Sequence, residues 1–194
     1  MKTIYLTRHG ESEGQLNKIV GGNSSITGKG KKYSNKLREY LDDKNVNIIM
    51  CSQLKRAVET AEIVNLENKY LISEVSNLNE IDGGIFEGWT TEKVKEKHPK
   101  IYEHRNKNKF LYSYPMGESY QDLEKRINPI LKEIDNTSEN LVIIAHQAVC
   151  RIIFCHLMKK DVEDCTNIDI NSHYVYRFTC NNDNMYNMEN ISFV

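Results

Sequence analysis

Short β-branched runs alternate along this chain with longer stretches in which apolar residues recur at helical spacing. The strand-like runs are residues 2–6, 46–50, 70–72, 141–145, 173–179 and 185–192. The helix-like stretches are residues 31–41, 53–64, 119–134 and 148–158. The run LVIIA at 141–145 is apolar throughout, which is typical of a strand in the middle of a parallel sheet. The alternation predicts an α/β fold, with three layers (α/β/α) around a mostly parallel central sheet.

Residues from about 90 to 115 interrupt this pattern. Two short, polar, helix-like stretches lie there, at 91–97 and 99–107, and they predict a small helical insertion, which the family resemblance described below implies lies over the active site. Ser52 and Ser119 are expected to cap the helices that follow them, and Pro129 is expected to kink the second of these. The chain shows no internal repeat and no linker, so residues 1–194 are expected to form a single domain.

Charge and composition narrow the class of protein. A formal net charge of -1 over 194 residues gives no electrostatic reason to expect nucleic acid or an anionic membrane as a partner. No apolar run approaches the ~20 residues of a membrane span. The five cysteines include no CxxC pair, which argues against a disulfide framework and a zinc site. The chain is expected to be cytoplasmic, without a signal peptide, and a monomer or homodimer.

Cationic side chains follow several of the predicted strands. Arg8 and His9 end the first strand, His146 follows the run 141–145, and Arg56 lies in the first turn of the helix after another strand. The carboxyl ends of parallel strands meet at one edge of a sheet, so these four side chains are expected to share a pocket. Each alone has an ordinary structural explanation, but together they indicate a site for a highly charged anion, best matched by phosphate.

A histidine in such a pocket can act as a nucleophile, and the leaving alkoxide then needs a proton from a carboxyl group. The candidate acids are Glu11, Glu80, Asp82 and Glu87. No HxH, HExxH or DxD arrangement accompanies them, so a mechanism without metal or cofactor is expected.

Several stretches resemble the histidine phosphatase superfamily, which has the phosphoglycerate-mutase-like fold. They are residues 6–12 (LTRHGES), 51–57 (CSQLKRA) with 60–61 (TA), and 145–146 (AH). Others are similar to the fructose-2,6-bisphosphatase domains of the bifunctional 6-phosphofructo-2-kinase/fructose-2,6-bisphosphatase family. These are residues 78–84 (LNEIDGG), 114–120 (YPMGESY) and 146–151 (HQAVCR). The resemblance implies hydrolysis of fructose 2,6-bisphosphate to fructose 6-phosphate and phosphate, through a phosphohistidine.

The resemblance also implies a role for each site residue. His9 would be the nucleophile and Glu80 the acid, while Arg8, Arg56 and His146 would hold the transferring phosphoryl group. The backbone at Gly21 would touch the sugar phosphate. The second phosphate of the substrate would be held by Arg105 and Lys109, with Tyr120, Gln147 and Arg151 completing that end.

The chain departs from the family pattern at three positions. Gln15 stands where the family has Asn, and an expected Tyr near Thr91 and an expected Arg near Ser113 are absent. These changes bear on substrate preference and leave the catalytic step intact. No Walker A loop is present, so a free-standing bisphosphatase is expected. The alternatives are a broader phosphatase of sugar phosphates, a phosphoglycerate mutase, and a catalytically silent sugar-phosphate sensor.

Overall fold

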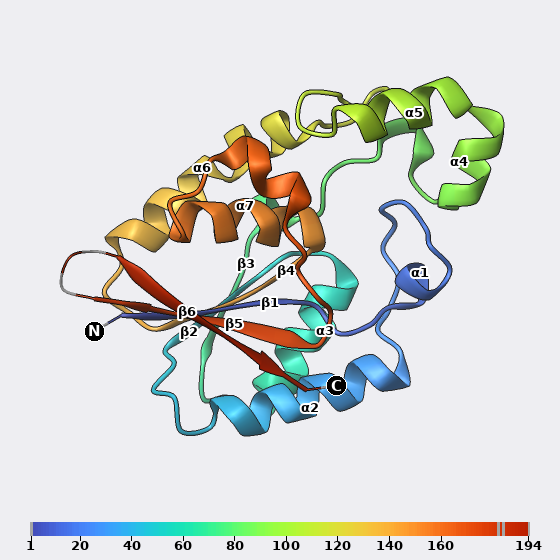
Figure 1. The fold of residues 1–194 in the computed structure, drawn as a ribbon. Helices are drawn as coiled ribbons and strands as arrows, with labels where there is room; N and C mark the ends of the chain where they lie inside the picture. Colours follow the sequence, from blue (N-terminus) through green and yellow to red (C-terminus); the bar gives the residue numbers. More distant parts are fainter. Residues whose placement is uncertain (1, 182, 184, 194) are drawn as a thin grey trace.

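The computed structural model describes residues 2–181, 183 and 185–193 of the chain, and its centre is a six-stranded mixed sheet (Figure 1). The strands are β1 (Thr3–Arg8), β2 (Ile48–Cys51), β3 (Leu71–Glu74), β4 (Leu141–Ala145), β5 (Tyr174–Cys180) and β6 (Tyr186–Ser192). Their order is β3-β2-β4-β1-β5-β6. The first four strands of this order are parallel, and β5 runs antiparallel to both of its neighbours.

Helices cover both faces of the sheet. Helices α2 (Gly28–Leu41) and α3 (Lys55–Val64) pack on one face, and α6 (Tyr120–Asn136) and α7 (Gln147–Leu157) on the other (Figure 1). The predicted three-layer α/β/α fold with a mostly parallel sheet is therefore confirmed.

The two faces follow from the period of two along each strand. In β1, Ile4 and Leu6 belong to the core cluster beneath α6 and α7, whereas Tyr5 belongs to the cluster beneath α2 and α3. Every residue of β4 is buried, as its uninterrupted apolar sequence predicts for a strand with neighbours on both sides. Because β4 and β1 are central, the segments that follow them lie at the middle of the sheet edge.

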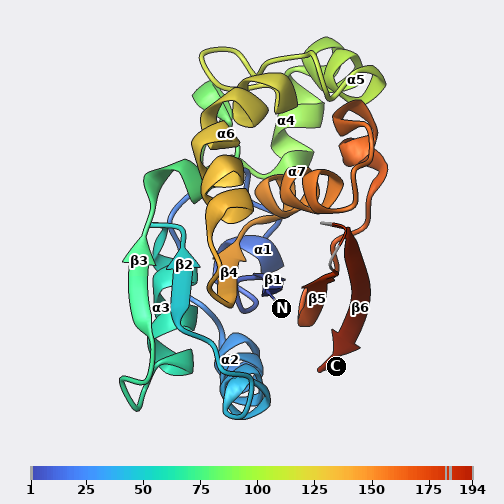
Figure 2. The ribbon, with the colours of Figure 1, turned by 90° about the vertical axis from the view of Figure 1, so that its left-hand side faces the viewer.

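The remaining elements are short, and those at the top of Figure 2 lie on the same side of the sheet as α6 and α7. The short elements are α1 (Glu13–Leu16), α4 (Thr91–Lys97), α5 (Pro99–Lys107) and the 3₁₀ helices at Ser76–Leu78, Gly84–Phe86 and Val162–Asn167. Helices α4 and α5 fall within the predicted insertion at about 90–115. Among the described residues, no helix has the length and apolar character needed to cross a membrane.

Helix ends agree with the sequence in one case and differ in another. Ser119 caps α6 in a reciprocal capping box with Asp122, as predicted. The prediction that Ser52 caps the next helix is wrong, because α3 begins at Lys55 with Leu54 at its cap position. The Ser52 hydroxyl instead reaches two side chains of the site described below. Helix α6 continues through Pro129.

Candidate active site

Two histidines meet where β1 and β4 end. The strands pair in parallel with Arg8 opposite Ala145, so His9 and His146 are the next residues along neighbouring strands. The backbone N–H of His9 donates to the carbonyl of Ala145 (3.0 Å) and extends the ladder by one bond. The two imidazole rings lie 5.0 Å apart between centroids. Strand pairing thus places both rings at one point of the sheet edge.

The hydrogen bonds of His9 fix its tautomer. Its Nδ1 lies 2.7 Å from the carbonyl oxygen of Gly10, which can only accept, so Nδ1 carries the proton. Its Nε2 accepts from Nε of Arg56 (3.1 Å). Burial, together with the charge of Arg56, lowers the pKa of His9 to about 3. His9 is therefore a neutral imidazole whose Nε2 lone pair is available for nucleophilic attack once Arg56 turns to an incoming anion.

Arg56 is held at this point by the start of α3. Its side chain is buried, and Nη1 donates to the carbonyl of Gly22 (2.7 Å). Thr60, one helical turn later, donates to the backbone carbonyl of Arg56 and accepts from the backbone N–H of Gly10 (3.0 Å). The helix therefore supports both the guanidinium and the loop that follows the nucleophile.

His146 is completely buried and its tautomer is also set by its neighbours. Asn79 Oδ1 accepts from the backbone N–H of Gln53 (3.0 Å) and from the Ser52 hydroxyl (2.8 Å). The Ser52 hydroxyl has then donated its proton, so His146 Nε2, 2.8 Å away, must donate to it. The remaining Nδ1 is buried with no hydrogen-bond partner among the described residues. In this tautomer Nδ1 is an acceptor, and burial lowers the pKa of His146 well below its ordinary value, so the ring is neutral.

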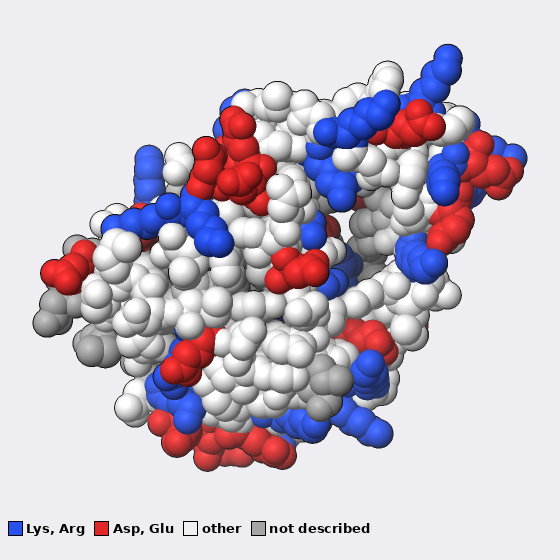
Figure 3. Space-filling view, in the orientation of Figure 1, with Lys and Arg blue, Asp and Glu red and all other residues white. Residues whose placement is uncertain are grey.

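A cavity of about 230 Å³ opens over His9, and we call it the central cavity. Of the predicted site residues, those that line it are Arg8, His9, Gln15, Gly21, Arg56, Glu80 and Gln147. Arg8 Nε is buried without a partner among the described residues, although Nη1 donates to the carbonyl of Ile170 (3.2 Å). On the face shown in Figure 3, the surface is hollowed beside the α4–α5 segment, and Lys and Arg atoms line the hollow. Arg8 thus brings an unmatched donor to the wall of the cavity.

Among the described residues, Glu80 is the one candidate acid that lines the central cavity. Glu11 accepts from the Thr27 hydroxyl at the start of α2, and Asp82 accepts from the backbone N–H of Gly84. Glu87 accepts from two backbone N–H groups, those of Gly22 (2.6 Å) and Gly83 (2.8 Å), and so ties two loops together.

The carboxyl of Glu80 rests against the start of α7. Its Oε1 accepts from the backbone N–H groups of Ile81 (2.9 Å) and Ala148 (3.2 Å). Burial lowers the pKa of both Arg8 and Arg56, and Glu80 opposes that shift in each. Of the four candidate acids, Glu80 is thus the one that the described residues place at the central cavity, in agreement with the role that the resemblance implied.

A second cavity of about 390 Å³, the distal cavity, adjoins the central cavity through Thr91 and Gln147. Arg105 and Lys109 line it, and Arg105 stacks over the ring of Tyr114 at 4.1 Å. Burial, and then the charge of Arg105, lowers the pKa of Lys109. The structure thus brings together two of the cations expected for a second phosphate.

Tyr120 and Arg151 do not line either cavity in the described part of the chain. Arg151 Nη1 donates to the hydroxyl of Tyr120 (2.9 Å), and Arg151 Nε donates to the carbonyl of Ile168 (2.7 Å). Arg151 lies close enough to lower the pKa of Arg8 and of Lys109. It therefore adds to the positive potential of both cavities from behind their walls.

The three departures from the family pattern have their own contacts. Gln15 Nε2 donates to the hydroxyl of Ser172 (2.9 Å). The Thr91 hydroxyl donates to the carbonyl of Lys18 (3.2 Å). The Ser113 hydroxyl donates to the capping carboxylate Asp122 (2.9 Å), so it belongs to the start of α6.

Several residues of the site were not predicted from the sequence. Ser52 and Asn79 set the tautomer of His146, Thr60 supports Arg56, and Tyr114 stacks on Arg105. All four lie inside the stretches that carried the family resemblance, which was the available signal. Among the described residues, no group of three or more His, Cys, Asp or Glu side chains could hold a metal ion.

The fold and the paired histidines are those of a phosphatase family, and comparison with known proteins identifies it. Residues 4–189 match the family model of the histidine phosphatase superfamily (branch 1), and the chain belongs to that superfamily. The rat 6-phosphofructo-2-kinase/fructose-2,6-bisphosphatase 3 is 35% identical over 199 residues, covering 98% of this chain and 35% of the relative. The human 6-phosphofructo-2-kinase/fructose-2,6-bisphosphatase 3 is 36% identical over 180 residues, covering 92% and 34%.

The chain thus spans about a third of the length of these curated relatives. Among solved structures, the α-ribazole phosphatase of Shigella flexneri is similar with a TM-score of 0.86 and 20% identity, covering 96% of this chain and 94% of that one. YhfR of Bacillus stearothermophilus has a TM-score of 0.86 and 24% identity, covering 96% and 95%. These likenesses concern the fold. Family membership and site together support a phosphatase that acts on a small phosphorylated substrate.

Proposed function

We propose that this protein hydrolyses the 2-phosphate of fructose 2,6-bisphosphate through a phosphohistidine at His9. The observation that carries the proposal is the pair of adjoining cavities, one built around the neutral His9 and one containing Arg105 and Lys109. A substrate with two phosphates needs two cationic ends, and these cavities supply them. The similarity to the fructose-2,6-bisphosphatase relatives supports the same choice.

In the first step, His9 Nε2 attacks the phosphorus atom and the bond from phosphorus to the sugar oxygen breaks. Glu80 gives its proton to that oxygen, so the sugar leaves as an alcohol. Arg8 and Arg56 neutralise the charge that builds up on the phosphoryl oxygens. His146 is neutral with Nδ1 as an acceptor, so it donates to one of these oxygens only after Nδ1 takes up a proton, which the negative charge of a bound phosphate favours. In a buried cavity such donors stabilise a negative charge more strongly than they would in water, because the effective dielectric constant is lower.

In the second step, water attacks the phosphorus of the phosphohistidine and the bond to His9 breaks. The carboxylate of Glu80 takes a proton from the water, and phosphate leaves. Enzyme and acid are then in their starting states. The sugar does not enter the second step, so water rather than a second sugar hydroxyl is the acceptor. A mutase would have to retain the phosphoryl group and return it.

The test is the release of fructose 6-phosphate from fructose 2,6-bisphosphate in EDTA, with fructose 1,6-bisphosphate and 3-phosphoglycerate as comparison substrates. We expect a strong preference for the 2,6-compound, its loss in His9→Ala, and acid-labile label on His9 after rapid quenching. Label that forms on the protein but is not lost in His9→Ala would contradict the assignment of the nucleophile. The absence of any label and turnover would indicate a silent sugar-phosphate sensor.

A broader sugar-phosphate phosphatase is the second candidate, and the contacts of Ser113 and Thr91 favour it. The Ser113 hydroxyl bonds to Asp122, so the family's arginine near this position has no replacement there. Thr91 bonds to the backbone at Lys18 and is too short to reproduce a tyrosine in the distal cavity. Comparable rates on all three substrates would support this broader activity.

A further inference from the structure

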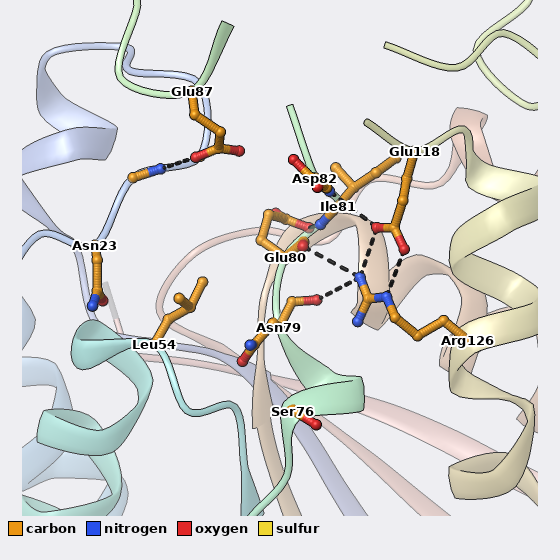
Figure 4. A pocket seen from close by; sticks show the side chains of 12 residues that line it. Asn23, Leu54, Ser76, Asn79, Glu80, Ile81, Asp82, Glu87, Glu118 and Arg126 are labelled. Atoms are coloured by element: carbon orange, nitrogen blue, oxygen red, sulfur yellow. Dashed lines mark hydrogen bonds and ion pairs between the residues drawn. The ribbon is translucent and has the colours of Figure 1, made fainter. Parts of the chain in front are cut away.

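The loop that carries Glu80 is fastened to α6 by one arginine. Arg126 Nη1 donates to the backbone carbonyl of Asn77 (2.8 Å), and Nη2 donates to the carbonyls of Asn79 (3.1 Å) and Glu80 (3.3 Å), as Figure 4 shows in part. The guanidinium therefore binds the main chain at Glu80 itself and at the residues just before it.

Glu118 completes this attachment on the other side of Glu80. Its carboxylate forms a two-pronged ion pair with Arg126, with Nε to Oε1 at 2.7 Å and Nη2 to Oε2 at 2.9 Å. The same Oε2 accepts from the backbone N–H of Asp82 (3.0 Å), and the Glu118 N–H donates to the Asp82 carbonyl (3.0 Å). The pair, which we call the Arg126–Glu118 clamp, thus holds the chain on both sides of Glu80.

Within the described residues, the contacts of the Arg126 guanidinium are all with the protein itself. All five hydrogen bonds of the Arg126 guanidinium go to oxygens of the protein. Arg8 and Arg105, in contrast, each have a buried Nε without a partner among the described residues. The Arg126 side chain is 23% exposed and that of Glu118 is 19% exposed, so the ion pair is partly shielded from water.

We propose that Arg126 and Glu118 are positioning residues that set the place of the acid Glu80, an inference that rests on the proposed function. The Glu80 carboxyl is held at Oε1 by the backbone of Ile81 and of Ala148. The clamp holds the main chain from which this carboxyl extends. A general acid must lie within hydrogen-bond distance of the leaving oxygen, and a displacement of about 1 Å can cost about 10²-fold in rate.

Two substrates with different leaving groups can separate misplacement of the acid Glu80 from a general loss of enzyme activity. An alkoxide leaving from a sugar phosphate needs the proton of Glu80, whereas p-nitrophenolate leaves without one. In Arg126→Gln we expect kcat/KM on the sugar phosphate to fall by about 10²-fold and on p-nitrophenyl phosphate by less than about 3-fold. Glu118→Gln, which keeps the side-chain volume, is expected to show a smaller loss with the same selectivity. The matched control is Arg177→Gln, which breaks the partly exposed Arg177–Glu189 pair (2.9 Å) between β5 and β6 and is expected to change neither rate.

Equal losses on both substrates, or no loss, in Arg126→Gln would overturn the inference. If Arg126→Gln does not fold, the same comparison is decided by Glu118→Gln. Glu80→Gln separates the role of Glu80 as the acid from the role of the Arg126–Glu118 clamp in positioning it. Selective loss in Glu80→Gln without selective loss in the clamp variants would overturn the clamp alone, whereas an unselective Glu80→Gln would overturn the assignment of the acid and the clamp with it.

Discussion

The buried nucleophile makes the stability of this protein depend on pH in a way that one substitution should remove. His9 has a pKa of about 3 in the folded protein, against the ordinary 6.5, because burial and Arg56 disfavour the charged ring. Below pH 6.5 the unfolded chain therefore binds a proton that the folded chain does not. The contribution of the neutral His9 ring to the unfolding free energy is fully present above pH 6.5. It falls as the pH drops toward 3, by up to about 1.4 kcal/mol per pH unit.

Between pH 8 and pH 4.5 this difference in proton binding amounts to about 3 kcal/mol of unfolding free energy. In His9→Gln the group that titrates is gone, while an amide remains that can accept from Arg56. We therefore expect the stability of the wild type to fall by about 3 kcal/mol more than that of His9→Gln over this range. The measurement is urea unfolding of both proteins at both pH values in phosphate-free buffer, because phosphate would bind the folded state.

A control must separate the loss of the titrating His9 ring from a general loss of unfolding free energy that does not depend on pH. Leu37→Ala removes a fully buried, non-titrating side chain from α2 and is expected to cost about 2–5 kcal/mol at both pH values. Its pH dependence should equal that of the wild type. If His9→Gln also follows the wild type to within 1 kcal/mol, the imidazole is not desolvated in the way the structure indicates, and the reasoning is refuted.

Three other substitutions test the cavities. Gly21→Ala places a methyl group 1.9 Å from the Glu87 carboxylate, at a residue whose φ is +59°. We expect a loss of at least about 1–2 kcal/mol of unfolding free energy and reduced phosphatase activity. Unchanged midpoints of urea unfolding would contradict this. Lys109→Gln should raise KM for a bisphosphorylated sugar about 10-fold and leave KM for p-nitrophenyl phosphate unchanged, which steady-state kinetics would check. Ser113→Arg should lower KM for the bisphosphorylated sugar about 10-fold, with loss of the bond to Asp122 visible as a small drop in Tm; an unchanged KM would place this side chain away from the second phosphate.

Much of the architecture could be predicted from the sequence, because strand and helix periods are local properties. The uninterrupted run at 141–145 predicted a central strand, and β4 is fully buried. The place of the site also follows a general rule, since ligands in open α/β sheets bind beyond the carboxyl ends of strands. Arg8, His9 and His146 could therefore be placed together before any coordinates were known.

Other features were decided by the tertiary structure alone. Ser52 has the position of a helix cap in the sequence, yet its hydroxyl bonds to Asn79 and His146, both remote in the chain. From the residues alone Glu80 was one of four possible acids, and only the family resemblance pointed to it before the cavity lining placed it beside His9. The contacts of Arg126 with the loop before Glu80 have no counterpart in any local pattern. Hydrogen bonds between distant segments depend on how elements pack, and periodicity carries no information about them.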